Sequence, residues 1–158
     1  MRKEVRVAKW LLALALVLPV FACGSVSAKG KVIPQIYMFG FSASFNDSVV
    51  YFTEIQQLDS VWVEAGSGFL QGRENYSYQL RNYLADKLGM PNRTCVVSYA
   101  KDRKDAEKKY LKMKRLYVDE GKGMYDVRFV DGKDFKFSVI DMSYEVGDAP
   151  TAASGLEH

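Results

Sequence analysis

Histidine is almost missing from this sequence of 158 residues, where the only one is His158, the last residue. Nucleophilic catalysis by Ser–His–Asp or Cys–His groups needs an imidazole as its base. A zinc site collects four ligands, mostly His and Cys, and the chain has only two Cys. We therefore expect no metal and no cofactor. An enzyme on this scaffold would have to work with carboxylates, Tyr, Lys or Arg.

Cysteine is also scarce, with only Cys23 and Cys95 in the chain. If Cys23 is removed or lipidated, no internal disulfide can form, and the domain depends on packing alone. Cys95 lies in the β-branched run "TCVVSY", which predicts a small, buried apolar side chain. A reactive thiol is the alternative.

Acidic and polar residues are rare at the N-terminus. Glu4 is the only acid among four basic residues, and the run 10–22 contains no charged or polar side chain. Basic, apolar and then small residues are the order of a secretory signal peptide, which we predict over 1–28. The apolar run is shorter than the roughly 20 residues that span a bilayer.

Two cleavage sites compete at the end of this leader. Val20-Phe21-Ala22-Cys23 resembles the bacterial lipobox, which would leave Cys23 as a lipid-bearing N-terminus. Val26-Ser27-Ala28 fits ordinary signal peptidase. We expect cleavage after Ala28 and a periplasmic or extracellular protein. The alternative is a protein anchored to the outer membrane through Cys23, and only then is a membrane a partner.

Excess charge of either sign is absent once the leader is removed. The leader carries four of the 22 basic residues and one of the 19 acidic residues, which leaves 18 of each. Net charge therefore gives no support for nucleic-acid binding. Locally, the segment 101–117 holds eight basic residues against three acids, which makes Lys104 and Lys108 candidates for binding an anionic group. A solvated helix face is the alternative.

The pattern of apolar residues predicts an α+β fold. Periodicity, turn residues and Asp-Gly between alternating runs predict strands at 32–41, 48–54, 59–64 and 94–99, helices at 73–88 and 102–118, and a hairpin of strands 125–130 and 135–140. We expect a two-layer sandwich in which one mixed sheet of five or six strands carries both helices on one face. Residues 29–146 form the single domain. The segment 147–158 is predicted to be disordered, and its Leu-Glu-His ending resembles the start of an expression tag.

Two short stretches carry further candidate residues. Phe41 and Phe45 lie among small residues at a predicted strand end, where exposed aromatics could stack on a sugar or a partner. Core packing and a turn cover are the alternatives. Arg73 and Glu74 open the first predicted helix, and they are a candidate binding pair. A favourable interaction with the helix dipole would explain Glu74 equally well.

The blocks "MFGFSASFNDSVVYFTEI" and "GRENYSYQLRNYL" resemble a group of short exported Bacteroidetes proteins with no assigned activity, over most of 32–144. The resemblance implies an envelope location and no catalytic residue. It also implies O-glycosylation of Ser48 and Ser60, because exported proteins of that group are modified at such Asp-Ser-Val tripeptides. Each Ser is expected to begin a strand after a loop, and turn-forming residues at a strand start are the alternative.

Two functions follow from these observations. The first is a non-enzymatic envelope protein that binds a protein or glycan partner, favoured by the leader, the missing histidine and the aromatic-rich domain. The alternative is a carboxylate-dependent, glycan-processing enzyme, which needs two carboxyl groups about 5–10 Å apart across a cleft.

Overall fold

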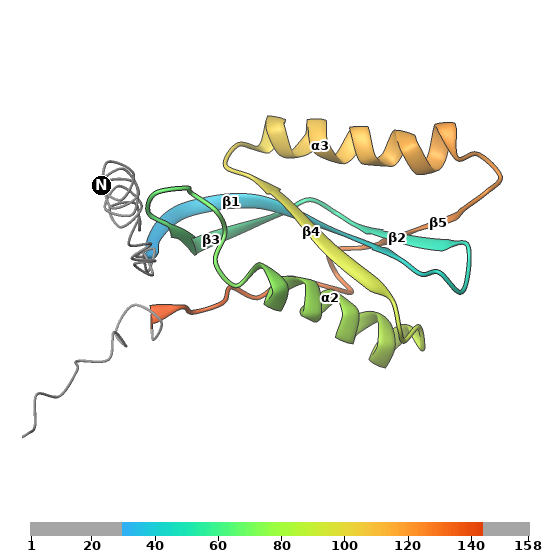
Figure 1. Ribbon diagram of the computed structural model, residues 1–158, viewed down its shortest axis with the longest axis horizontal. Coiled ribbons are helices and arrows are strands. Elements are labelled where there is room, and N and C mark those ends of the chain that lie inside the picture. Colours follow the sequence, from blue (N-terminus) through green and yellow to red (C-terminus); the bar gives the residue numbers. More distant parts are fainter. Residues whose placement is uncertain (1–29, 144–158) are drawn as a thin grey trace, which may run out of the picture.

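The computed structural model describes residues 30–143, which form one five-stranded mixed sheet with a helix on each side (Figure 1). The predictions for the leader, for Cys23 and for 147–158 lie outside these residues. The elements are β1 (Gly30–Ala43), β2 (Val49–Thr53), β3 (Gln56–Glu64), α2 (Arg73–Leu88), β4 (Thr94–Ala100), α3 (Arg103–Arg115), a π-helical turn (Leu116–Glu120) and β5 (Asp126–Val130).

The long strand β1 is the centre of the sheet. It pairs antiparallel with β2 and β3 along one edge and with β4 along the other. β5 lies beyond β2 and is parallel to it. β4 and β5 therefore run in the same direction. The predicted mixed sheet of five strands with two helices is confirmed.

A β-bulge separates β2 from β3 at the middle of the sheet. Met38 pairs with Gln56 and Phe41 with Phe52, so three steps along β1 match four steps on its partner. The extra residue interrupts the ladder. There the Gly40 N–H donates to the Thr53 Oγ1 at 2.8 Å, and this buried bond replaces a backbone bond.

The two helices cover opposite faces of the sheet, so the prediction that both lie on one face is wrong. Successive β1 side chains alternate between the faces. Met38 packs on the side of α2, while Phe39 meets Tyr110 of α3 with ring centroids 5.0 Å apart. Met38 and Phe39 are both fully buried. A strand that is apolar on both faces needs a cover on each, which gives three layers.

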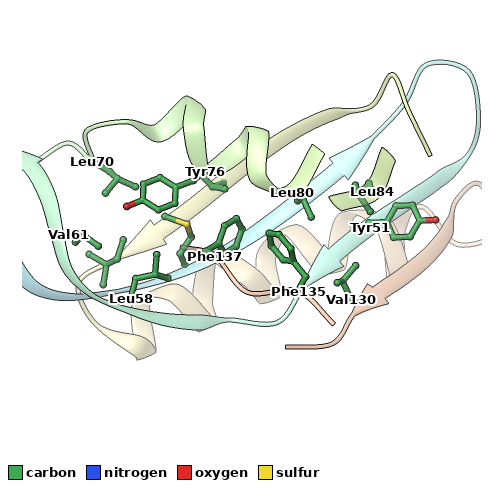
Figure 2. Close-up of a cluster of buried hydrophobic side chains, with 13 residues drawn as sticks. Tyr51, Leu58, Val61, Leu70, Tyr76, Leu80, Leu84, Val130, Phe135 and Phe137 are labelled. Carbon is green, nitrogen blue, oxygen red and sulfur yellow. The ribbon is translucent and has the colours of Figure 1, made fainter. Parts of the chain in front are cut away.

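The second strand of the predicted hairpin is not formed, and the segment 135–142 instead crosses the α2 face of the sheet. Phe135 and Phe137 are buried there against α2 (Figure 2). The side-chain amides of Gln56 and Gln79 bond its backbone in place of a strand ladder. The predicted alternation was real, but it reports burial against a helix and not sheet pairing.

Helix α2 has the predicted bounds because glycine limits it on both sides. Gly72 and Gly89 both have φ of +64°, a left-handed conformation that glycine adopts at little cost. The Met90 N–H donates to the Leu84 O at 2.9 Å and closes the C-terminus. Glycine therefore sets both ends of α2, and Arg73 is the first residue of the helix.

Candidate functional site

A cavity of about 680 Å³ opens where β4 ends, α3 begins and the β3–α2 loop passes. Four cationic and two acidic side chains line it, together with two aromatic rings: Arg73, Lys101, Lys108, Lys109, Asp102, Asp105, Phe69 and Tyr99. These residues come from two stretches of the chain, 67–73 and 98–109, so only the fold brings the two together. The excess of cationic groups makes the cavity a candidate site for an anion.

Two of the cations are held in place by the edge strand β4. Arg73 Nη2 donates to the Val97 O at 2.9 Å, and Lys109 Nζ donates to the Tyr99 O at 2.7 Å. These carbonyls are two residues apart, so they face the same edge of the strand. The two side chains thus cover the edge of β4 and lose little further freedom when an anion binds. Lys101 makes no ion pair within residues 30–143.

The acidic side chains of the cavity have different surroundings. Lys108 Nζ donates to Asp105 Oδ1 at 3.0 Å, and this hydrogen bond, with the lysine charge, lowers the pKa of Asp105. Asp105 is therefore ionised at neutral pH and unsuited to act as a general acid. Asp102 occupies the N-cap position of α3, but its side chain makes no capping hydrogen bond.

Phe69 is an exposed ring on a rigid loop. Its carbonyl accepts the Glu64 N–H at 2.8 Å, and its own N–H donates to the Ser67 Oγ at 3.1 Å. The next residue, Leu70, is buried, and its N–H donates to the Tyr99 hydroxyl at 2.8 Å. The Phe69 side chain is nevertheless 65% exposed. The loop thus holds a large apolar ring in water at the rim of the cavity.

A second cavity, of about 300 Å³, adjoins the first. Phe69, Arg73 and Tyr99 line both cavities. Glu64, Gln71 and Glu74 line only the smaller one, which therefore has acidic and amide character. Within residues 30–143 the Gln71 Oε1 is buried without a hydrogen-bond partner.

The predicted binding residues are divided by the fold. Arg73 and Lys108 meet in the basic cavity, and Glu74 lines its neighbour. Lys104 is exposed on α3 but does not line the cavity. Phe41 is only 8% exposed and packs on Phe52, so its assignment as a binding residue is wrong. Tyr110 and Met113 of α3 pack on a core on that face of the sheet, and Phe41 supplies part of it.

Phe45 is fully exposed at the turn between β1 and β2. Ala43 pairs with Thr94 and Tyr37 with Ala100, so this turn lies beside the start of β4, whereas the basic cavity lies beside its end. Phe45 is therefore remote from that cavity. Its exposure agrees with the prediction, but Phe45 lines neither the basic cavity nor the one at the end of β5.

The two candidate glycosylation sites are both exposed. Ser48 directly precedes β2, as expected. Ser60 lies inside β3, opposite Pro34 of β1, with φ of +57°. The expectation that Ser60 begins a strand after a loop is wrong, because β3 starts at Gln56.

Two carboxylates share another cavity, of about 630 Å³, at the end of β5. Glu54 Oε2 accepts the Gly132 N–H at 3.1 Å, and Asp131 Oδ1 accepts the Lys133 N–H at 2.7 Å. Both groups thus stabilise the turn after β5. Two carboxylates in one cavity are the groups that a glycan-processing enzyme would need.

Residues 30–143 contain neither a cluster of metal-ligating side chains nor a membrane-spanning helix. In the described part of the chain, no three His, Cys, Asp or Glu side chains are placed to hold a metal ion together. Among residues 30–143, no helix combines the length and the apolar character needed to cross a bilayer. Burial raises the pKa of the partly buried Cys95 thiol, as expected of a packed side chain more than of a reactive one.

No protein-family model, no curated protein and no solved structure matches this chain. The site must therefore be interpreted from its own geometry.

Sequence reasoning missed Phe69, Tyr99, Lys101 and Lys109. Phe69 follows the loop "AGSG", and the argument that singled out Phe45 among small residues applies to it equally. Lys101 and Lys109 belong to the basic segment 101–117, but no local pattern indicates which of its lysines face β4. The order of strands decides that.

Proposed function

We propose that this protein is an exported binding module of the cell envelope that carries out no chemistry and binds an acidic ligand in the basic cavity. One observation carries the proposal: Arg73, Lys101, Lys108 and Lys109 converge on one cavity from α2, the β4–α3 connection and α3. Only two acids, Asp102 and Asp105, oppose them there. The equal numbers of acids and bases in the mature chain make this local excess a specific feature.

The physical properties of the cavity support a compact anionic ligand. Its volume lies in the range of small-molecule sites, about 300–1,000 Å³. Hydrogen bonds between ionised partners are roughly twice as strong as neutral ones. Arg73 and Lys109 are already positioned by β4, which lowers the entropic cost of binding.

Export supports an envelope glycan or protein as the source of this ligand. The leader places the domain outside the cytoplasm, and cleavage after Ala28 would leave a free protein starting at Lys29. The intact mass of the protein isolated from its own host tests this step. A chain starting at Cys23 and carrying acyl groups would show an outer-membrane lipoprotein instead.

The alternative is a carboxylate-dependent, glycan-processing enzyme, and the shared cavity of Glu54 and Asp131 is the observation in its favour. Both carboxylates accept backbone N–H bonds of the turn, which favours a structural role. Polysaccharide hydrolysis by the purified protein that is lost in Glu54→Gln would establish the enzyme.

Anion binding is tested by recording amide NMR spectra during titration with sodium sulfate at constant ionic strength. We expect shifts around Gly68 and at the start of α3. The double variant Lys101→Gln/Lys108→Gln should weaken binding at least about tenfold, which corresponds to about 1.4 kcal/mol. Lys104→Gln/Lys122→Gln removes the same charge outside the cavity and is the matched control. Equal losses in both variants would show non-specific attraction and contradict the proposal.

A further inference from the structure

The basic cavity and its smaller neighbour form two compartments of one site. They have volumes of about 680 and 300 Å³, and they share Phe69, Arg73 and Tyr99. A ligand that fills only the first compartment would leave one side of Phe69 unused. A ligand of at least two linked units is needed to contact both compartments.

The two compartments differ in charge, and this difference determines which part of the ligand enters each compartment. The larger one offers Lys101 and Lys108 to an anionic group. The smaller one offers Glu64 and Glu74, which repel a second anion but accept hydrogen bonds from hydroxyl groups. The ligand therefore carries an acidic group at one unit and neutral donors at the next.

Phe69 separates these units with a flat ring whose backbone is fixed by the Glu64 and Ser67 bonds. The C–H groups of a sugar ring carry partial positive charge, and they pack on the negative face of an aromatic ring. An exposed ring of this kind among polar groups suits a saccharide, whose two ring faces are apolar and whose edges bear hydroxyls.

An acidic peptide fits the same place less well. An extended peptide would gain most of its affinity by adding a strand to the free edge of β4. The carbonyls of Val97 and Tyr99 already accept hydrogen bonds from Arg73 and Lys109. Strand addition would break both bonds, as expected of an edge protected by cationic side chains.

From this arrangement we infer that the ligand is an acidic oligosaccharide of at least two sugar units. One unit places a carboxylate or sulfate group among Lys101, Lys108 and Arg73. Its neighbour packs on Phe69 and donates hydroxyl hydrogen bonds to Glu64 or Glu74. This inference rests on the proposed anion-binding function of the basic cavity and adds the class of ligand.

The test is calorimetric titration of the mature protein with five probes: tetragalacturonate, a sulfated heparin-derived tetrasaccharide, neutral maltotetraose, a hexaglutamate peptide and sodium sulfate. We expect one or both acidic oligosaccharides to bind at least about tenfold more tightly than maltotetraose, hexaglutamate and sulfate. Tetragalacturonate carries carboxylates alone, so its binding would identify a carboxylate, whereas binding of only the heparin-derived probe would identify a sulfate group.

Phe69→Ala separates stacking from charge. The variant should lower the affinity for the oligosaccharide at least about tenfold and leave the affinity for sulfate unchanged. Because the ring is 65% exposed, the variant should keep the wild-type melting temperature. Phe45→Ala removes an equally large exposed ring at the other end of β4, and it should change neither.

The outcomes distinguish the saccharide inference from the anion-binding function on which it rests. Sulfate or hexaglutamate binding without preference for an acidic oligosaccharide would overturn the saccharide inference and leave the anion site standing. An unchanged oligosaccharide affinity in Phe69→Ala would overturn it as well. Failure of all five probes to bind would contradict the anion site itself.

Discussion

Arg93 Nη1 donates to both carboxylate oxygens of Asp47, at 3.1 Å to Oδ1 and 2.9 Å to Oδ2, in a partly buried ion pair. Arg93 is 3% exposed, and it also donates to the Ser42 Oγ and the Val49 O. Its guanidinium carbon lies 5.1 Å from the centre of the Tyr51 ring. This buried cation joins the α2–β4 connection to the turn that carries Phe45.

Asp47→Asn should lower the free energy of unfolding by about 1–3 kcal/mol, because it leaves a buried guanidinium without its counter-charge. The matched control is Glu107→Gln, which breaks an ion pair of the same 2.9 Å length between exposed side chains. That change should cost no more than about 0.5 kcal/mol. Urea denaturation of both variants measures the difference, and equal effects would contradict the role given to Arg93.

Gly40→Ala should destabilise the fold by about 1–3 kcal/mol. A Cβ at this position would lie 2.6 Å from Leu80 Cδ2 and 3.1 Å from Phe137 Cζ, so α2 and the segment 135–142 would have to move. Gly66→Ala is the control, because a Cβ there meets nothing within 4 Å. Thermal melting should show a lower midpoint for the first variant and no decrease for the second.

Gln79→Glu should loosen the segment 135–142. The Gln79 amide donates to the Ser138 O at 2.8 Å and accepts the Ser138 N–H at 2.7 Å. The carboxylate keeps the acceptor but loses the donor and faces the carbonyl oxygen. We expect faster amide exchange at Phe137 and Ser138 and a loss of about 1–2 kcal/mol. Gln57→Glu, at an exposed position on β3, should leave this exchange unchanged.

The fold should lose stability at high pH partly through Tyr76. Burial raises the pKa of its hydroxyl above the ordinary 10.0, although the Ile140 N–H bond to its oxygen acts in the opposite direction. A folded-state pKa above the unfolded one gives stability that is complete below about pH 10 and is lost as pH rises through the folded-state value.

Melting temperatures between about pH 8 and pH 11 measure this contribution. The decline should be shallower in Tyr76→Phe than in the wild type. Tyr78→Phe, on the same helix but 46% exposed, should decline like the wild type. Identical slopes in all three proteins would show that Tyr76 does not contribute.

The sequence determined the elements that depend on local patterns. The helix 73–88 has its predicted bounds because left-handed glycines flank it, and the strands follow runs of β-branched and aromatic residues. The alternation around Asp131-Gly132 predicts a hairpin that is not formed, because Phe135 and Phe137 face a helix-covered core and Gly132 lacks the positive φ of a hairpin turn.

The tertiary structure alone decided where the helices and the site lie. α2 precedes β4 and α3 follows it. No local sequence pattern specifies which face of the sheet each helix covers. Likewise Lys108 is far along the chain from Phe69 and Arg73, and it meets them only because β4 lies beside β1 at the edge of the sheet. A local pattern reports which side chains are buried, whereas long-range pairing decides which exposed ones become neighbours.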